Sequence, residues 1–445
     1  MKYFGTDGIR GIANLDLTPE FAVKVGKAAG IYFKGDLIVS KDPRLSSDSI
    51  ESALISGILS TGVNVYSTGI LPTPALSLLL KINGKSGGAM VSASHNPIEY
   101  NGIKFFNRNG IKLSEREEEE IEKLIDQEIK LTNNFGNNIN FFEGKTYYID
   151  EVVRKNKINL KNFKIALDLA YGATTVVAPI IFSILNANLI LYNEKPDGNR
   201  INVNCGSTNI EFLKKKKMEA NFDIGFSFDG DGDRVIVVDE IGEVVDGDMI
   251  MFLIAKYLKI KEIVITVMSN FGLKVLLNKY GIKYYEVPVG DRNVLYKMLE
   301  VNADLGGEQS GHIIFLPQSK TGDGIITSLL LLKVILNENK PLYELKKEFI
   351  KYPQILRNVE VKDKNKIMHD EIFLKEVMLW NNKLNGKGRV LVRPSGTENL
   401  IRIMVEGEDE KEIKEIAFSL EDLLKKRLAQ MNNLGDEEEG SPKHN

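Results

Sequence analysis

Short apolar stretches alternate with stretches of helical periodicity through most of this chain. In the first such series, strand composition is found at residues 37–40, 63–66 and 88–91. Helical periodicity is found between these stretches, at residues 47–60 and 74–81. This order is typical of α/β folds, in which helices cover the faces of a largely parallel sheet. We therefore expect an α/β protein.

The same order recurs twice and is followed by a shorter α+β unit at about 359–429. The later elements are expected at 163–169, 174–185, 189–191, 224–228, 263–267, 272–280 and 284–287. A length of 445 residues allows about two to four domains. The predicted fold class is three similar α/β domains with mixed sheets, followed by a C-terminal α+β domain.

The domain boundaries are expected in polar stretches at 132–144 and 246–248 and at the pair 352–353. The predicted domains are 1–145, 146–246, 247–355 and 356–430, followed by a tail at 431–445. The tail is polar and acidic, so we expect it to be disordered.

The overall charge gives no sign of a polyanionic partner. Lys and Arg total 58 against 61 for Asp and Glu, a net charge of -3, so we expect no binding to nucleic acid or to an anionic membrane. The single cysteine, Cys205, excludes an internal disulfide. No apolar stretch is long enough to span a membrane, and the chain starts without the apolar core of an export signal. These features predict a cytoplasmic protein.

Three aspartates spaced two apart by glycine are the strongest chemical signal. The chain reads Asp229-Gly230-Asp231-Gly232-Asp233-Arg234. Like charges this close repel one another, and a carboxylate cluster stays ionised only when an opposite charge offsets the repulsion. The glycines let the carboxylates converge, and all-oxygen ligation favours Mg²⁺, Mn²⁺ or Ca²⁺. We therefore predict a divalent metal site, with the arginine as a fixed cation beside it.

An EF-hand loop is the nearest alternative, because the three aspartates and Glu240 match four of its ligand positions. Arg234, however, stands where the sharp turn of that loop needs glycine. Residues 224–228 and 235–238 also read as buried strands, which places the aspartates at a strand end. A solvated acidic turn without metal is the other alternative.

A serine stands in the turn that follows the strand at 88–91. The turn is expected to expose Ser94 on a rigid support, where its hydroxyl can act as a nucleophile. No acid or base partner is evident nearby in the sequence, so an ordinary turn stays an alternative. With a metal loop in a neighbouring unit, the serine suggests chemistry at an interface, in which the cation neutralises phosphate carried on the serine.

Two further loops combine small donors with charged groups. Residues 393–399 and Arg402 join hydroxyls on a turn to two guanidinium groups, which are the ingredients of a phosphate site or of a capped turn. Residues 306–312 combine glycines with hydroxyl, amide, carboxylate and imidazole groups. That set suits recognition of a polar ligand such as a sugar, although a hairpin turn also explains it.

Five motifs in this order over nearly the whole chain resemble the α-D-phosphohexomutase superfamily. They are residues 5–11, the Ser94 turn, the Asp229 loop, residues 307–312 and residues 393–397. The resemblance implies four domains around a central cleft, the last related to the TATA-binding-protein fold. One loop from each domain would meet at the active site.

The resemblance also implies a role for each polar residue. Ser94 would be a phosphoserine whose phosphate, together with the three aspartates, holds one Mg²⁺ per active site. Arg10, Lys104 and His312 match positions near the transferred phosphoryl group. The implied sugar and phosphate ligands are Arg234, Glu308, Ser310, Arg393, Ser395, Gly396, Thr397 and Arg402.

Within the superfamily, residues 3–11 and Gln309 resemble enzymes that act on an amino-sugar phosphate. The implied reaction interconverts glucosamine 6-phosphate and glucosamine 1-phosphate on the route to UDP-N-acetylglucosamine. Glucosamine 1,6-bisphosphate would be its intermediate and activator. The implied partners are the phosphosugar, a second copy of the chain in a homodimer and a kinase that phosphorylates Ser94.

Other functions stay open at this point. A superfamily member that prefers glucose or mannose phosphates would differ mainly in residues 308–312. A non-catalytic phosphosugar-binding protein would keep the fold without turnover, and a metal-dependent phosphatase would release inorganic phosphate. Residues 40–44 depart from the usual superfamily pattern but remove no catalytic group.

Overall fold

The computed structural model describes residues 2–5, 7–129, 133–384, 386–395 and 399–439, and for 431–439 it describes the backbone only. The chain divides into two compact units. The first unit consists of Met1–Ser269 and Leu277–Glu348, and the second of Asn270–Leu276 and Phe349–Asn445. None of the helices in the described ranges combines the length and apolarity needed to cross a bilayer.

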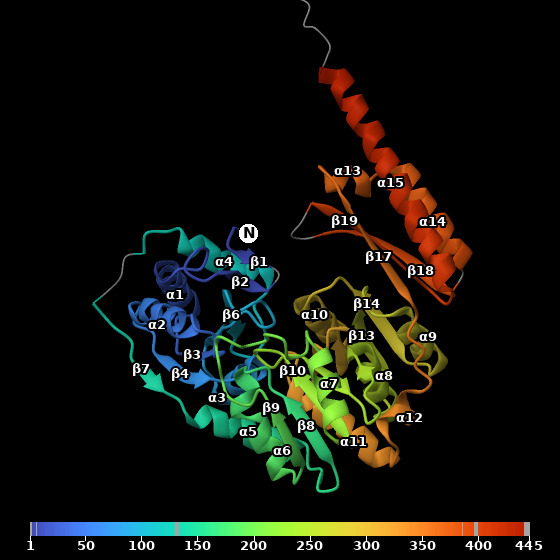
Figure 1. Ribbon diagram of the computed structural model, residues 1–445. Helices are drawn as coiled ribbons and strands as arrows, with labels where there is room; N and C mark the ends of the chain where they lie inside the picture. Colours follow the sequence, from blue (N-terminus) through green and yellow to red (C-terminus); the bar gives the residue numbers. More distant parts are fainter. Residues whose placement is uncertain (1, 6, 130–132, 385, 396–398, 440–445) are drawn as a thin grey trace, which may run out of the picture. The chain divides into compact units, whose positions relative to one another are not determined.

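The first sheet has seven strands in the order β1-β2-β6-β5-β3-β4-β7. Figure 1 labels β1, β2, β6, β3, β4 and β7 of this sheet. They are β1 (Phe4–Gly5), β2 (Gly8–Ile12), β3 (Leu37–Lys41), β4 (Val65–Ile70), β5 (Gly87–Val91), β6 (Tyr100–Asn107) and β7 (Asn138–Asn140). Strands β5, β3 and β4 run parallel, and β6 runs antiparallel to β5. The helices of this region are α1 (Pro19–Phe33), α2 (Ser47–Leu59), α3 (Thr73–Asn83), α4 (Glu115–Ile125) and α5 (Glu143–Lys155).

Local sequence explains where these helices begin. Thr18 caps α1 by accepting a hydrogen bond from the N–H of Phe21, and proline opens the helix. Ser114 and Glu117 form a capping box at the start of α4. Buried apolar side chains of β3, α1 and α2 then join in one core cluster, which fixes these helices against the sheet.

The second sheet has the strand order β12-β11-β10-β8-β9. Its strands are β8 (Lys164–Asp168), β9 (Asn188–Tyr192), β10 (Ile224–Phe228), β11 (Val235–Val238) and β12 (Val244–Val245). Strand β8 runs parallel to β9 and β10, whereas β11 runs antiparallel to β10. The helical segments of this region are η1 (Ala173–Val176), α6 (Ala178–Ile184) and α7 (Glu211–Glu219).

The third sheet has the strand order β14-β13-β15-β16. Its strands are β13 (Glu262–Thr266), β14 (Lys283–Val287), β15 (Leu305–Gly307) and β16 (Ile313–Phe315). Only the last pair, β15 with β16, is antiparallel. The helices of this region are α8 (Gly247–Tyr257), α9 (Phe271–Lys279), α10 (Asp291–Val301), α11 (Gly324–Glu338) and α12 (Leu342–Lys346).

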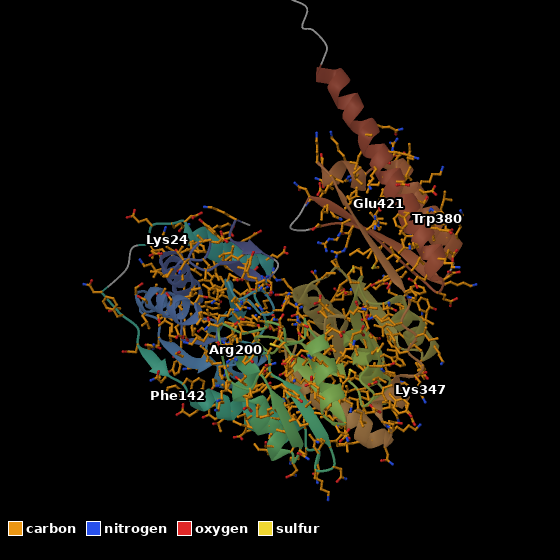
Figure 2. The ribbon with its side chains drawn as sticks, in the orientation of Figure 1. Lys24, Phe142, Arg200, Lys347, Trp380 and Glu421 are labelled. Carbon is orange, nitrogen blue, oxygen red and sulfur yellow. The ribbon has the colours of Figure 1, made fainter. Side chains whose placement is uncertain are left out.

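The second unit contains a three-stranded antiparallel sheet in the order β17-β19-β18. Its elements are β17 (Gln354–Glu360), α13 (Lys364–Met368), α14 (Glu371–Leu384), β18 (Gly388–Pro394), β19 (Leu400–Gly407) and α15 (Glu410–Glu439). Helices α14 and α15, which carry Trp380 and Glu421 in Figure 2, form one apolar core with the strands. Glu421 also pairs with Arg357 of β17, so charge as well as apolar contact joins α15 to the sheet.

The predicted fold class is confirmed, with mixed α/β sheets followed by a small antiparallel sheet and its helices. Helix α15 continues to Glu439, so the first part of the segment 431–445, expected to be disordered, is helical, and 440–445 lie outside the described residues. The polar stretch 132–144, expected as a domain boundary, contains β7, which pairs with β4. The predicted boundaries at 145 and 355 fall within α5 and β17, and the domain limits stay a prediction.

Three loops of the first unit follow the carboxyl ends of strands that run parallel to a neighbour. The Ser94 turn follows β5, the Asp229 loop follows β10, and the Glu308 loop follows β15. Each of these strands has a parallel partner on one side, namely β3, β8 and β13. In α/β folds ligands bind at this edge of the sheet.

Candidate active site

The predicted metal loop, residues 229–234, joins β10 to β11. These strands are buried and pair antiparallel, with Phe228 opposite Val235. Gly232 has a φ of +77°, which glycine adopts without a steric penalty. The loop therefore turns between two strands, as predicted, and not between two helices as in an EF-hand.

The loop gathers three buried carboxylates, those of Asp229, Asp231 and Asp233. One oxygen of each lies within 4.8 Å of the others. Oδ1 of Asp231 and Oδ1 of Asp233 accept no hydrogen bond from the described residues. Burial, and then the charges of Asp233 and Asp231, raise the pKa of Asp229 well above its usual value. Such a set fits a hard divalent cation, which would offset the repulsion.

Ser94 lies in the turn between β5 and β6, beneath the metal loop. Its residue surface is 1% exposed, so the prediction that the turn exposes it is wrong, because the Asp229 loop covers it. The hydroxyl donates to Oδ2 of Asp229 at 2.6 Å, and Nδ1 of His95 lies 3.3 Å from the same hydroxyl oxygen. Burial and the charge of Arg234 lower the pKa of His95 to about 4. The structure thus places two polar partners on the Ser94 hydroxyl, the adjacent His95 and the carboxylate of Asp229, which is 135 positions away in the sequence.

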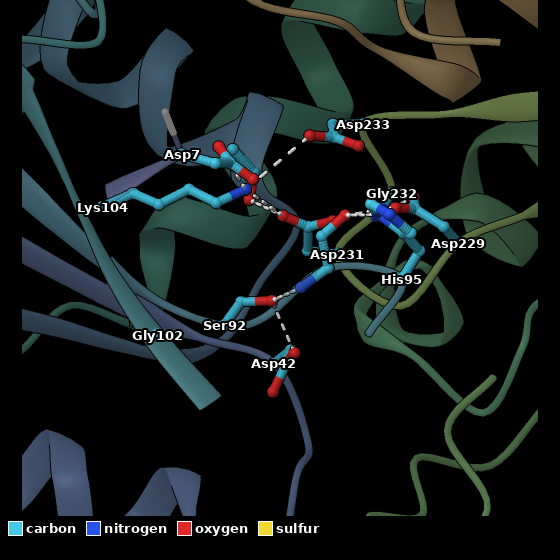
Figure 3. Close-up of polar contacts among 12 residues, drawn as sticks. Asp7, Asp42, Ser92, His95, Gly102, Lys104, Asp229, Asp231, Gly232 and Asp233 are labelled. Carbon is cyan, nitrogen blue, oxygen red and sulfur yellow. Dashed lines mark hydrogen bonds and ion pairs between the residues drawn. The ribbon is translucent and has the colours of Figure 1, made fainter. Parts of the chain in front are cut away.

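Two cations of the first sheet lie beside the cluster. Nζ of Lys104, on β6, is 3.4 Å from Asp231 and 3.6 Å from Asp7 (Figure 3). Arg10, on β2, pairs with Asp7 and donates to Oδ1 of Asn96 at 2.8 Å. Burial opposes the charge of Lys104, but Asp231 and Asp7 raise its pKa. Lys104 therefore stays protonated in this acidic environment.

His312 joins the third sheet to the metal loop. It forms an isolated antiparallel bridge with Arg234, and its Nδ1 lies 3.5 Å from Asp233. The N–H of Gly322 donates to Nε2 at 3.2 Å, so Nδ1 carries the proton that faces the carboxylate. Nε of Arg234 is 3.8 Å from Asp233. All four predicted catalytic residues therefore lie around one carboxylate cluster in the first unit.

The predicted sugar loop is a hairpin between β15 and β16. Oγ of Ser310 donates to Oε2 of Glu308 at 3.3 Å, and the N–H of Gly290 donates to Oε1 of Glu308 at 2.9 Å. The N–H of Val235 donates to the carbonyl of Gly311 at 3.2 Å. This bond holds the hairpin beside the metal loop.

The predicted phosphate loop lies in the second unit, between β18 and β19. Arg393 and Arg402 are opposite each other on the two strands, and Arg402 donates to Oγ of Ser395 at 3.3 Å. Burial and the charge of Arg402 lower the pKa of Arg393. Gly396 and Thr397 lie outside the described residues. The described part brings together two guanidinium groups and a hydroxyl, a set that can bind an anion.

Several residues that the sequence did not place in the site lie against it. Thr73, at the start of α3, donates to Oδ2 of Asp231 at 2.6 Å. Arg44 and Asn202 donate to the carbonyl of Ser94 at 2.8 Å and 2.9 Å. Arg44 belongs to the stretch 40–44, which the sequence marked only by its departure from the superfamily pattern. Thr73 and Asn202 carry no motif, because their contacts join segments remote in sequence.

Known structures share this fold at low sequence identity. A phosphoglucomutase/phosphomannomutase family protein from Burkholderia thailandensis matches with a TM-score of 0.80 and 23% identity, over 93% of this chain and 95% of its own. N-acetylphosphoglucosamine mutase of Aspergillus fumigatus, solved with GlcNAc-6P and magnesium, matches with a TM-score of 0.68 and 17% identity, over 94% and 95%. These matches show the fold.

Bacterial relatives are much closer in sequence. Phosphoglucosamine mutase of Clostridioides difficile (strain 630) is 45% identical over 446 residues, which cover 96% of this chain and 100% of the relative. Phosphoglucosamine mutase of Carboxydothermus hydrogenoformans is 48% identical over 436 residues, which cover 93% and 97%.

Four family models match successive parts of the chain. The models for phosphoglucomutase/phosphomannomutase α/β/α domains I, II and III and for the C-terminal domain match residues 1–132, 146–242, 246–352 and 356–423. Together they match most of the chain, in the order in which the domains are numbered. The chain therefore belongs to the phosphoglucomutase/phosphomannomutase family.

Proposed function

We propose that this protein catalyses the phosphoglucosamine mutase reaction, the interconversion of glucosamine 6-phosphate and glucosamine 1-phosphate. The observation that carries the proposal is the 2.6 Å contact between the hydroxyl of Ser94 and Asp229, a member of a carboxylate cluster suited to a divalent cation. Relatives named phosphoglucosamine mutase are 45% and 48% identical over nearly the whole chain, which supports the amino sugar as substrate. The enzyme is an isomerase that transfers phosphate within its substrate.

Ser94 is the proposed carrier of the phosphoryl group. Phosphorylated Ser94 gives its phosphoryl group to the free hydroxyl of the sugar phosphate, which forms glucosamine 1,6-bisphosphate. The bisphosphate then turns end for end, and its other phosphoryl group returns to the serine. Each transfer breaks one P–O bond and forms one, so the enzyme returns to its starting state after one cycle.

The charges around Ser94 suit this chemistry. Asp229, Asp231 and Asp233 are the proposed ligands of Mg²⁺, together with the serine phosphate, and bound Mg²⁺ neutralises phosphate charge. Lys104 and the other nearby cations are preorganised to stabilise the negative charge on the transferred group. His312, whose Nδ1 lies 3.5 Å from Asp233, is a candidate for proton transfer with the sugar hydroxyl.

Two loops are the proposed sugar and phosphate ligands. Glu308 and Ser310 lie together beside the metal loop and offer a carboxylate and a hydroxyl to the sugar. The loop of the second unit is the proposed site for the phosphate that is not reacting. Its proposed ligands are Arg393, Ser395, Gly396, Thr397 and Arg402, and Arg234 is proposed to contact the substrate from the metal loop.

The test is ³¹P NMR of glucosamine 6-phosphate with the purified protein, Mg²⁺ and a trace of glucosamine 1,6-bisphosphate. A growing signal of glucosamine 1-phosphate supports the proposal. The same experiment with glucose 6-phosphate and mannose 6-phosphate measures the preference for the amino sugar. Equal or faster turnover of either sugar would contradict glucosamine as the main substrate.

The Ser94→Ala variant is the control, because it removes the proposed phosphate carrier and leaves the three aspartates of the proposed metal site in place. Isomerisation should vanish, while the circular dichroism spectrum stays that of the parent protein. Retained isomerisation would show that Ser94 is not the carrier. If the parent protein released inorganic phosphate faster than it isomerised the sugar phosphate, it would be a phosphatase instead.

A further inference from the structure

The backbone of Ser94 has an uncommon conformation. Its φ is +52°, in the left-handed region that side chains other than glycine, asparagine and aspartate seldom adopt. Such a conformation persists only where surrounding contacts hold it. The contacts of the Ser94 peptide groups therefore show what aims its hydroxyl at Asp229.

Arg44 holds the carbonyl side of the turn. Its side chain is buried, and Nη2 donates to the carbonyls of Ser94 and Asn96, each at 2.8 Å. Nη1 donates to the carbonyl of Tyr100 at 2.9 Å. Nε donates to Oδ2 of Asp42 at 3.0 Å, which fixes the plane of the guanidinium group. One rigid side chain thus ties several carbonyls of the turn together.

The same carboxylate also reaches the amide side of Ser94. Oγ of Ser92 donates to Oδ2 of Asp42 at 2.6 Å (Figure 3), and the N–H of Ser94 donates to Oγ of Ser92 at 2.8 Å. All three side chains are buried. Asp42 therefore holds both Arg44, which donates to the carbonyl of Ser94, and Ser92, which accepts from the N–H of Ser94.

A second donor to the Ser94 carbonyl comes from the region of the second sheet. Nδ2 of Asn202 donates to this oxygen at 2.9 Å. Asn202 itself has a φ of +61°, a conformation that asparagine tolerates. A Cβ added to Gly230 of the metal loop would lie 2.7 Å from the Ser94 carbonyl oxygen and 2.8 Å from Nδ2 of Asn202. The metal loop is therefore packed directly over this hydrogen bond.

From these contacts we propose that Arg44 and Asn202 are positioning residues for phosphoryl transfer, which hold Ser94 in its left-handed conformation through its carbonyl. The inference rests on the proposed function, in which Ser94 carries the phosphate. Arg44 lies in the loop that joins β3 of the first sheet to α2, whereas Asn202 lies between β9 and β10 of the second sheet. Through Asn202, the orientation of the Ser94 hydroxyl thus depends on how the second sheet packs against the first. A small error in this aim slows an in-line transfer strongly.

The test compares two asparagines of one loop that both have left-handed backbones. Asn202→Gly keeps the backbone conformation accessible and deletes the donor to Ser94. Asn204→Gly is the matched control, because Asn204 has a φ of +54° and is exposed. Arg44→Lys keeps a cation beside Asp42 but cannot bridge the same set of carbonyls.

The readouts are kcat, KM and a single-turnover transfer of labelled phosphate from glucosamine 1,6-bisphosphate to Ser94. Asn202→Gly should lower kcat and the transfer rate about tenfold, as expected for one lost buried hydrogen bond, with KM within about twofold of the parent. Arg44→Lys should lower both rates about 100-fold, and Asn204→Gly should change neither by more than about twofold. Thermal unfolding of each variant establishes that it is folded at the assay temperature.

The outcomes separate the inference from the proposed function. A transfer rate for Asn202→Gly equal to that of Asn204→Gly would overturn the inference, and so would a rise in KM with kcat unchanged. If Arg44→Lys does not fold, the asparagine pair alone decides. Failure of the parent protein itself to accept phosphate on Ser94 would refute the proposed function and, with it, the inference.

Discussion

Oγ of Ser94 lies 2.6 Å from Oδ2 of Asp229, although the two residues follow strands of different sheets and are 135 positions apart in sequence. The proposed phosphate carrier and the proposed metal ligand therefore form one site only when the first and second sheets are docked. Changes that alter the charge around this contact should affect metal binding, activity and stability in different ways.

The first prediction concerns the repulsion within the carboxylate cluster. Asp229→Asn should raise the stability of the metal-free protein by about 1 kcal/mol, because it removes one of three buried like charges. It should also lower kcat at least about 100-fold, because a proposed metal ligand is lost. Thermal unfolding in EDTA and in Mg²⁺, together with the NMR assay, measures both effects.

Asp168→Asn is the matched control for this prediction. Asp168 is also buried and, like Asp229, its carboxylate accepts hydrogen bonds, here from Ser227 and from the N–H of Gly206, each at 2.7 Å. It is not one of the three clustered carboxylates, so its replacement relieves none of their repulsion. An amide cannot accept all of these bonds, so this variant should be less stable than the parent by about 1–3 kcal/mol. A metal-free Asp229→Asn protein that is also less stable than the parent would contradict the account of the cluster.

The second prediction concerns the cation of the first sheet that faces the cluster. Lys104→Met should destabilise the metal-free protein by about 3 kcal/mol, because Asp231 and Asp7 lose their buried partner. Saturating Mg²⁺ should reduce this loss, since the metal supplies positive charge to the same carboxylates. Unfolding curves of parent and variant with and without Mg²⁺ provide the comparison. An equal loss in both conditions would show that Lys104 and the metal do not share the cluster.

The third prediction concerns pH and the start of α11. Burial raises the pKa of Asp323 from 3.8 to about 6 in the folded protein. Between about pH 4 and 6 the carboxyl of Asp323 is therefore protonated in the folded protein and ionised in the unfolded protein. The stability that this proton gives the folded protein is fully present below about pH 4 and is lost as the pH rises through 6. Asp323→Asn should stabilise the protein at pH 7.5 by about 2 kcal/mol and have little effect at pH 4. Denaturant unfolding at several pH values measures this.

Asparagine suits this test because it also caps helices, and Oδ1 of Asp323 accepts from the N–H of Ile326 at 2.9 Å. Tyr148→Phe is the control, since the Tyr148 hydroxyl donates to Oδ2 of Asp323 at 3.0 Å. Removing this donor should destabilise the protein most above pH 6, where the carboxylate is charged. A pH-independent effect of Asp323→Asn would refute the raised pKa.

The fourth prediction concerns two arginines of the second unit that face each other on neighbouring strands, Arg393 and Arg402. Arg393→Gln should raise KM for glucosamine 6-phosphate about tenfold or more, because the proposed charge-assisted bond to the phosphate that is not reacting is lost. Stability should not fall, since Arg393 lies opposite a like charge on Arg402. Steady-state kinetics and thermal unfolding together test both statements.

Arg389→Gln on the same strand is the control. Nε of Arg389 pairs with the buried carboxylate of Glu406 at 2.6 Å, so this variant should lose stability while KM stays near that of the parent. If the two variants changed KM equally, the loop would not be a specific phosphate site.

Some parts of the site could be predicted from short stretches of sequence. The aspartates of residues 229–234 converge because glycines stand between them, and the flanking apolar runs form β10 and β11 as expected. Other parts could not be predicted this way. The sequence suggested an exposed Ser94, whereas the packed structure buries it under a loop from another sheet.

The sequence by itself determined the α/β class, the approximate positions of most strands and the chemical character of each loop, because hydrophobic periodicity and turn chemistry act over a few residues. Only the tertiary structure decided that Ser94 faces Asp229, that Arg44 and Asn202 share its carbonyl, and that Tyr148 meets Asp323. These pairs result from the packing of whole sheets and helices, in which each contact depends on many apolar residues far away in the chain.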